Sequence, residues 1–280
     1  MLGHKENKNR FKSITTSNSG EKERVMKKTL IYTLSASSLT VLTMGGLLVV
    51  NANAASVGVA KSDAKVAFTT PTTPLTPLDP GTGTNPVTPS TPGDTNTPGT
   101  VADGQGLSLD YVPNLNFGTH AVPTATTTYS AWNLTDGTNP LPLYMQVSDY
   151  RAANTGWSVS VKEEGNFTSA SGSNLAGNTL TLGNSANAVV NAHNIAADLP
   201  STGIVVNTAE QVVFAASANK GLGSNLLDFG GSTANTAKDP DDSAQTVDPA
   251  VTLNVLGGSA TGTSYSTTLD WTLYNAPAMG

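Results

Sequence analysis

The sequence lacks cysteine and is poor in charged and aromatic side chains. None of its 280 residues is a cysteine, 12% are charged and 6% are aromatic. The absence of cysteine excludes disulfide bonds and any zinc or iron–sulfur site with cysteine ligands. Acidic residues outnumber basic ones, which gives a formal net charge of −6. This balance argues against nucleic-acid binding, because that function needs a basic surface that displaces counterions.

The net charge is an average over two unlike parts of the chain. Residues 1–54 hold eight basic and three acidic side chains, whereas residues 55–280 hold six basic and 17 acidic ones. Removal of the first part leaves a formal net charge of −11. A protein of this charge gains nothing from bulk electrostatic attraction to a polyanionic surface.

A basic pair, Lys27-Lys28, precedes an apolar stretch at residues 30–50. The sequence then reads Ala52-Asn53-Ala54, a small-x-small pattern that signal peptidases cleave. We therefore predict a cleaved secretory signal peptide over residues 1–54. A transmembrane anchor is the alternative, since 21 residues just span a bilayer, but six Ser or Thr residues and two adjacent glycines weigh against it.

Residues 55–101 are predicted to be a linker rich in Pro, Thr and Gly. Between residues 69 and 100 there are eight prolines and twelve threonines, no aromatic residue, and Val87 as the one β-branched apolar residue. Such a composition does not bury enough apolar area to offset the entropy lost on ordering. We therefore expect a disordered tether, with a reach of at most about 100 Å, in front of the folded domain.

Residues 102–280 are predicted to form one all-β domain. Runs of four to eight residues alternate apolar and polar side chains between clusters of Gly, Asn, Asp and Pro. In the clearest run, one face carries Tyr265, Thr267, Leu269, Trp271 and Leu273. A strand with one apolar and one Ser/Thr-rich face belongs to an antiparallel sheet with a solvated side. The expected fold is a single antiparallel β-sandwich-like domain, with residues 186–197 as the best place for a short helix.

The sequence offers no convincing catalytic motif. His120 and His193, the two histidines beyond the leader, have no second histidine at metal-ligand spacing, and there is no Gly-x-Ser-x-Gly motif or phosphate-binding glycine loop. Glu163 and Glu164 are neighbours in a predicted strand, so they point to opposite faces and cannot flank one glycosidic bond. We therefore expect no enzyme activity and no cofactor.

Two further segments match functional signals only in part. The acidic loop with Asp239, Asp241, Asp242 and Asp248 lacks the spacing of an EF-hand, so we interpret it as a solvated turn and not as a metal site. Residues 199–203 read Leu-Pro-Ser-Thr-Gly, like a sortase signal, but 77 residues follow without an apolar run of membrane length. We interpret this segment as a turn, and expect neither a covalent nor a membrane anchor.

Three segments occur in an order that matches a known family. They are residues 108–118, residues 146–161, which include Trp157-Ser158-Val159, and residues 268–277. Together with the spacer before them, over residues 79–280, they resemble the WxL-domain surface proteins of low-GC Gram-positive bacteria. The first Trp motif departs from the family pattern, because it reads Trp-Ser-Val and not Trp-x-Leu.

The resemblance implies an extracellular protein, attached non-covalently to the cell wall of a Gram-positive bacterium by a domain that binds peptidoglycan. It also implies complexes with WxL-interacting proteins and with small sortase-anchored surface proteins. The site residues that carry over are Trp157, Val159, Trp271 and Leu273. Indole rings stack on sugar faces and donate an N–H hydrogen bond, so they suit a glycan platform. Alternatively, both tryptophans are core anchors, because they alternate in phase with aliphatic residues.

Two other functions stay open on the sequence alone. One is a structural subunit that docks on another surface protein without binding glycan. The other is a wall-directed hydrolase, although no acid/base pair in the sequence supports it.

Overall fold

The computed structural model describes residues 57–183, 189–191, 197–198, 203–230 and 236–278. The predicted signal peptide, His193 and residues 199–202 of the Leu-Pro-Ser-Thr-Gly segment lie outside this part. In the described ranges every regular element is a β-strand, and no helix there is long and apolar enough to cross a membrane. Described residues from Lys65 onward belong to one compact unit, separate from those before it. The all-β prediction is confirmed.

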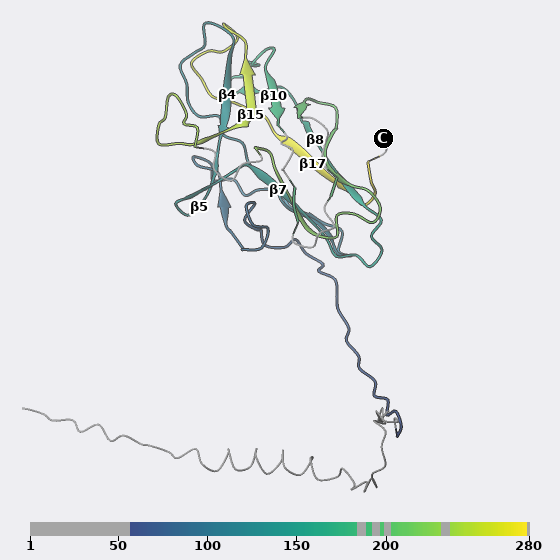
Figure 1. The fold of residues 1–280 in the computed structure, drawn as a ribbon. Helices are drawn as coiled ribbons and strands as arrows, with labels where there is room; N and C mark the ends of the chain where they lie inside the picture. The colour runs from purple at the N-terminus through teal and green to yellow at the C-terminus, as the bar shows by residue number, and fades with distance from the viewer. Residues whose placement is uncertain (1–56, 184–188, 192–196, 199–202, 231–235, 279–280) are drawn as a thin grey trace, which may run out of the picture. The chain divides into compact units, whose positions relative to one another are not determined.

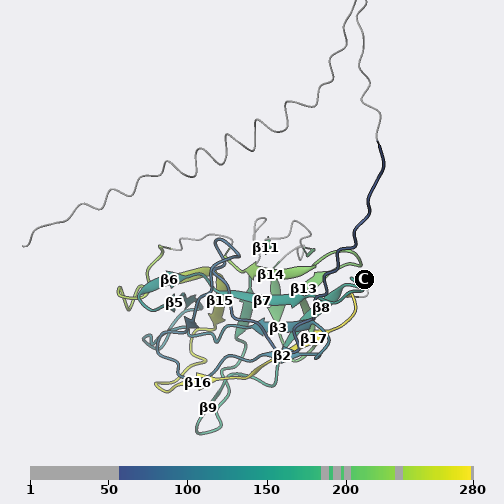
Figure 2. The same ribbon diagram turned by 90° about the horizontal axis from the view of Figure 1, so that it is seen from below.

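The strands form three main antiparallel sheets (Figures 1 and 2). The first has the order β11 (Val189–Asn191), β14 (Gly223–Asp228), β7 (Tyr144–Asp149), β3 (Leu107–Tyr111) and β2 (Val101–Ala102). The second has the order β12 (Ile204–Val206), β10 (Thr179–Leu182), β15 (Val247–Val255) and β4 (Thr127–Trp132). The third consists of β13 (Gln211–Ala216), β8 (Trp157–Glu163) and β17 (Leu269–Tyr274), with β8 in the centre.

Two small sheets complete the fold. One consists of β1 (Pro89–Ser90), β5 (Leu134–Asp136) and β6 (Asn139–Leu141). The other pairs β16 (Tyr265–Ser266) with β9 (Thr168–Ser169), which Figure 2 shows side by side. A single hydrophobic cluster joins the main sheets, with Val147 from β7, Leu253 from β15 and Val159 from β8 among its members. This cluster is the core expected from the period-2 pattern.

A polar face of the first sheet is buried, although a Ser-rich face predicts exposure to solvent. Asp110 of β3 and Gln146 of β7 are almost completely buried there, and the amide of Gln146 donates to Asp110 Oδ2 at 2.9 Å. Residues of the predicted linker cover them. The backbone N–H of Leu75 donates to Asp110 Oδ1 at 2.8 Å, and that of Leu78 donates to Gln146 Oε1 at 2.7 Å.

The second half of the predicted linker is therefore ordered against the domain. β1 pairs with β5 and β2 pairs with β3, so strand pairing begins before residue 102. This differs from the expectation of a tether without structure up to residue 101. Proline and threonine bury little area of their own, but the backbone N–H groups between the prolines satisfy buried side chains that would otherwise lack partners.

The prediction of a short helix at residues 186–197 is wrong for the part of this range that the structure describes. Val189–Asn191 form β11, which pairs with Leu227, Leu226 and Asn225 of β14. Two consecutive valines favour a pleated strand over a helix.

Candidate functional site

Trp157 and Val159, two of the four predicted contact residues, have no exposed surface (0% each). The Trp157 ring packs edge-on against Phe214, with ring centroids 4.9 Å apart, and its Nε1–H donates to the Gly221 carbonyl at 3.3 Å. Neither side chain presents a face to a glycan in this structure. Trp157 is therefore a core residue, which is the second of the two interpretations of its strand pattern.

Trp271 and Leu273, the other two, lie on the edge strand β17 and are only half-buried. Trp271 is paired with Val161 of β8, and Leu273 with Val159. Residues paired across an antiparallel sheet lie on the same face, so the structure brings all four predicted residues to one face. Exposure increases from the central strand to the edge strand, and Trp271 is the accessible tryptophan of the pair.

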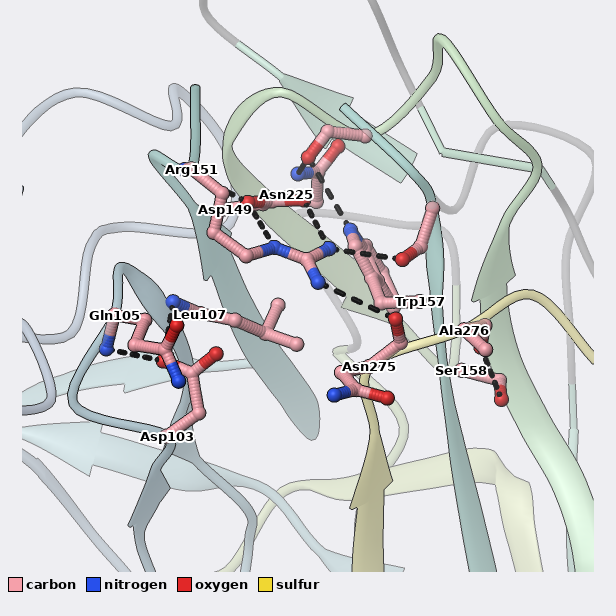
Figure 3. Close-up of polar contacts among 12 residues, drawn as sticks. Asp103, Gln105, Leu107, Asp149, Arg151, Trp157, Ser158, Asn225, Asn275 and Ala276 are labelled. Atoms are coloured by element: carbon pink, nitrogen blue, oxygen red, sulfur yellow. Dashed lines mark hydrogen bonds and ion pairs between the residues drawn. The ribbon is translucent and has the colours of Figure 1, made fainter. Parts of the chain in front are cut away.

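Arg151 connects the segments that carry the two Trp motifs (Figure 3). Its Nε and one terminal nitrogen donate to the two oxygens of Asp149, at 2.9 and 2.7 Å. It also donates to the carbonyls of Gly156, at 2.8 Å, and Asn275, at 3.3 Å. The hydrogen bond to Asp149 raises the pKa of the guanidinium above its usual value, and Asp149 itself is fully buried. The bidentate ion pair orients the guanidinium at the end of β7. Its hydrogen bonds to Gly156 and Asn275 then connect this end to the start of β8 and the end of β17.

Gly156 is required at this junction for two reasons. Its φ is +83°, in the region that glycine adopts without strain. In addition, a Cβ at this position would clash with the carbonyl oxygen of Ala216. The glycine thus lets the chain turn closely enough to insert Trp157 into the core.

A groove of about 1030 Å³ opens beside Trp271. Two continuous segments, residues 112–123 and 260–271, line it from opposite parts of the sequence. Buried apolar side chains such as Leu180 and Leu253 contribute to its lining. Four aromatic side chains that line the groove are half-buried and come from separate segments: Phe117, Tyr129, Tyr265 and Trp271.

The remaining groove lining is rich in neutral polar groups. Asn114, Asn116 and the Thr/Ser run at residues 261–268 supply amides and hydroxyls. Two carboxylates, Asp94 and Asp270, also line the groove, and its lining residues include no Lys or Arg. Half-buried aromatic rings surrounded by amides and hydroxyls suit an uncharged polyhydroxyl ligand.

The family described as "WxL domain surface cell wall-binding" matches residues 55–277. This chain belongs to the WxL family. It is therefore a cell-surface protein that binds the cell wall, and its family is a binding family and not a catalytic one. No curated protein and no solved structure matches the chain.

His120, which lines the groove of this WxL protein, belongs to a cluster that the sequence did not predict. His120 Nδ1 lies 2.7 Å from Asp241 Oδ2, across 121 positions of the chain, and Nε2 lies 2.5 Å from the Phe117 carbonyl oxygen. The imidazole ring also stacks on Tyr129, with centroids 4.2 Å apart. No spacing rule connects residues so distant in sequence. The cluster fixes the Tyr129 ring and residues 117–120, both part of the groove.

Asp239 lies beside this cluster, and its ligand atoms together with those of His120 and Asp241 lie within 4.8 Å of one another. Its oxygens already accept N–H bonds from the Trp132 indole, at 2.6 Å, and from the backbone of Asp241, at 2.8 Å. Burial would raise the pKa of Asp239, but these hydrogen bonds outweigh it and hold the pKa below its usual value. A cation would have to displace these donors. We therefore interpret the arrangement as one that holds the loop at residues 239–242 in place, and not as a metal site.

Glu163 and Glu164 differ in environment, as their opposite strand faces predict. Glu163 continues the inner face of β8 and is buried, whereas Glu164 is exposed. One Glu163 oxygen, Oε1, has no hydrogen-bond partner in the described part of the chain. Burial raises the pKa of the Glu163 carboxyl above its usual value.

The substitution Glu163→Gln is expected to stabilise the WxL domain at neutral pH. Since the pKa is higher in the folded state, the stability that protonation provides is present below the unfolded pKa of about 4.3 and is lost as the pH rises through the folded value. Urea unfolding should show the variant to be more stable than wild type at pH 7 and equal to it near pH 3.5. Glu164→Gln is the matched control and should change little. A destabilised Glu163→Gln variant at pH 7 would contradict this account.

Proposed function

We propose that this WxL protein is secreted and attaches non-covalently to peptidoglycan through the groove between residues 112–123 and 260–271. The observation that supports it most is the set of four half-buried aromatic rings that line one groove. Half-exposed rings stack on sugar faces, and the amides and hydroxyls between them are suited to sugar hydroxyl groups. Trp271 is the predicted contact residue that this proposal retains. Leu273 supports it from the same strand face.

The charges around the groove favour peptidoglycan over a polyanionic wall polymer. Asp94 and Asp270 line the groove, and its lining includes no Lys or Arg. A teichoic acid would meet repulsion there, whereas the sugars of a glycan strand would not. Binding by stacking and hydrogen bonds acts over short distances, so salt should screen it little.

Co-sedimentation of the full chain with purified peptidoglycan tests this proposal. The pelleted fraction should be similar at low salt and at about 0.5 M salt, where the Debye length is only a few ångströms. Removal of teichoic acids from the wall preparation should not reduce it. A steep loss of binding with salt, or binding that requires teichoic acid, would contradict the proposal.

We also propose protein partners for this chain, and this part of the proposal rests on the family resemblance alone. They are WxL-interacting proteins and small sortase-anchored surface proteins. If the chain binds such a purified partner but not bare peptidoglycan, the structural-subunit alternative replaces our proposal. If the chain releases soluble fragments from dye-labelled peptidoglycan, the hydrolase alternative replaces our proposal.

A further inference from the structure

Both ring nitrogens of His120 face oxygen atoms that accept hydrogen bonds. Nδ1 lies 2.7 Å from Oδ2 of Asp241, and Nε2 lies 2.5 Å from the carbonyl oxygen of Phe117. The carboxylate of Asp239 lies 3.9 Å from Nε2. A carbonyl or carboxylate oxygen accepts a hydrogen bond and has no proton to donate. Each ring nitrogen must therefore carry a proton if both short contacts are to be hydrogen bonds.

A neutral imidazole satisfies only one of these two contacts, because one of its nitrogens is a donor and the other an acceptor. With the proton on Nε2, the lone pair of Nδ1 faces the carboxylate of Asp241. With the proton on Nδ1, the lone pair of Nε2 faces the carbonyl of Phe117. The His120 side chain is only 11% exposed, so water does not easily replace the lost bond. The observed arrangement therefore fits the protonated ring.

The groups around the imidazole ring also favour its positive charge. In the described part of the chain, the charged groups within 4 Å of the ring nitrogens are the carboxylates of Asp239 and Asp241. Lys238 and Asp242 belong to the same loop, and both are exposed. Tyr129 of β4 stacks on the ring with centroids 4.2 Å apart, and the face of an aromatic ring attracts a cation.

The imidazole ring joins separate parts of the groove. His120, Phe117 and Tyr129 all line it, and Asp241 belongs to the loop at residues 239–242. The ring thus holds the lining segment against β4 and against this loop. If the ring loses one of its two hydrogen bonds, residues 117–120 lose an anchor and Tyr129 loses the support of its stacking partner. The shape of the groove therefore depends on the proton of the imidazole.

We propose that protonated His120 is a positioning residue of the groove and makes cell-wall binding depend on pH. When the pH rises and the ring loses its proton, residues 117–120 separate from the loop at residues 239–242, and the groove loses the shape that binds the wall. The change in the groove follows from the contacts of His120. The change in binding rests, in addition, on the proposed function.

The substitution Asp241→Asn separates the position of the ring from its charge. A side-chain amide offers either an oxygen that accepts from a protonated Nδ1 or an N–H that donates to the lone pair of Nδ1. It therefore satisfies the charged ring and the neutral ring alike, and this variant should keep its contacts when the pH rises. His193→Gln changes the other histidine beyond the leader. It is the control and should respond to pH as the wild type does.

Amide hydrogen exchange of the full chain tests the proposal without a ligand. The measurement is made at about pH 5.5 and about pH 8.5, on either side of most of the range in which imidazoles titrate. At the lower pH, residues 117–120 should exchange equally fast in the wild type and in Asp241→Asn. At the higher pH they should exchange about tenfold faster in the wild type, because the segment opens more often there. Comparing the two proteins at one pH removes the intrinsic effect of pH on exchange.

Co-sedimentation with purified peptidoglycan at the same two pH values tests the effect on binding. The wild type should bind about tenfold more weakly at the higher pH, as expected for the loss of a hydrogen bond to a charged group. The affinity of Asp241→Asn should change by less than about twofold between the two pH values. Titration of the peptidoglycan itself affects both proteins equally, so it does not produce this difference.

Three results would overturn the proposal. The first is equal exchange of residues 117–120 in the wild type and Asp241→Asn at the higher pH. The second is a pH response that disappears in His193→Gln. The third is exchange that responds as expected while peptidoglycan binding by the wild type does not change with pH. If no peptidoglycan binds at either pH and the exchange response is intact, the proposed function is contradicted and the role of His120 in the groove is supported.

Discussion

Substitution of Trp157 by alanine is expected to lower the free energy of unfolding by about 3–5 kcal/mol. The indole has no exposed surface and packs edge-on against Phe214, so its removal leaves a cavity in the core. A loss of this size is a large part of the stability of an ordinary domain, which is about 5–15 kcal/mol. Urea denaturation of the full chain measures it. Trp157→Phe, which retains much of the volume, should lose less.

Trp271→Ala is the matched control for this prediction. Trp271 occupies the same face of the same sheet, but on the edge strand, where it is half-buried. Its removal should therefore cost clearly less stability than removal of Trp157. Equal losses in the two variants would contradict the assignment of Trp157 as the core tryptophan and Trp271 as the accessible one.

Arg151→Ala is expected to be the second severe substitution, with a loss of about 3–5 kcal/mol. It leaves the fully buried Asp149 without its bidentate partner, at a junction where Arg151 also holds Gly156 and Asn275. Most of the cost is the uncompensated buried charge. The double variant Arg151→Ala/Asp149→Asn should recover part of the loss in the same unfolding measurement.

The exposed ion pair between Lys162 and Asp270 is the control for Arg151. Its atoms are 3.7 Å apart, and the side chains are 36% and 41% exposed. Such pairs contribute about 0–1 kcal/mol, so Lys162→Ala should unfold almost like the wild type. If Arg151→Ala is no less stable than Lys162→Ala, the junction does not hold the two Trp segments together.

The alternation of side chains predicted the β8 and β17 strands and the apolar face of each, but not their pairing or their positions in the sheet. Trp157 and Trp271 follow the same local pattern of alternating aliphatic residues. The difference between them arises because β8 is central and β17 is at the edge. Strand order depends on long-range pairing, which a period in the sequence does not encode. The choice between core and contact roles therefore required the structure.

The ordered half of the linker was hidden for a related reason. Composition reports what a segment can bury by itself, and residues 69–100 can bury little. Leu75 and Leu78 are instead held through their backbone N–H groups by Asp110 and Gln146. The contact is visible only when the segment and the sheet are seen together.

The groove combines residues that no local motif joins. Tyr129 is fixed by His120, which in turn contacts Asp241 from a distant loop. Trp271 was predicted through the family resemblance, whereas Phe117, Tyr129 and Tyr265 were not. The sequence thus offered both tryptophans as candidates, and the structure showed which one is accessible and which residues surround it.

The most direct test of the central claim is peptidoglycan co-sedimentation of Trp271→Ala beside Tyr274→Ala. Both residues lie on β17, but Trp271 lines the groove, whereas Tyr274 is exposed outside it. After both variants are shown to be folded, Trp271→Ala should weaken binding by about tenfold or more, as expected for loss of an aromatic contact worth about 1.4 kcal/mol. Tyr274→Ala should stay within about twofold of wild type. Wild-type binding by folded Trp271→Ala, or equal losses in both variants, would contradict the assignment of the groove as the wall-binding site.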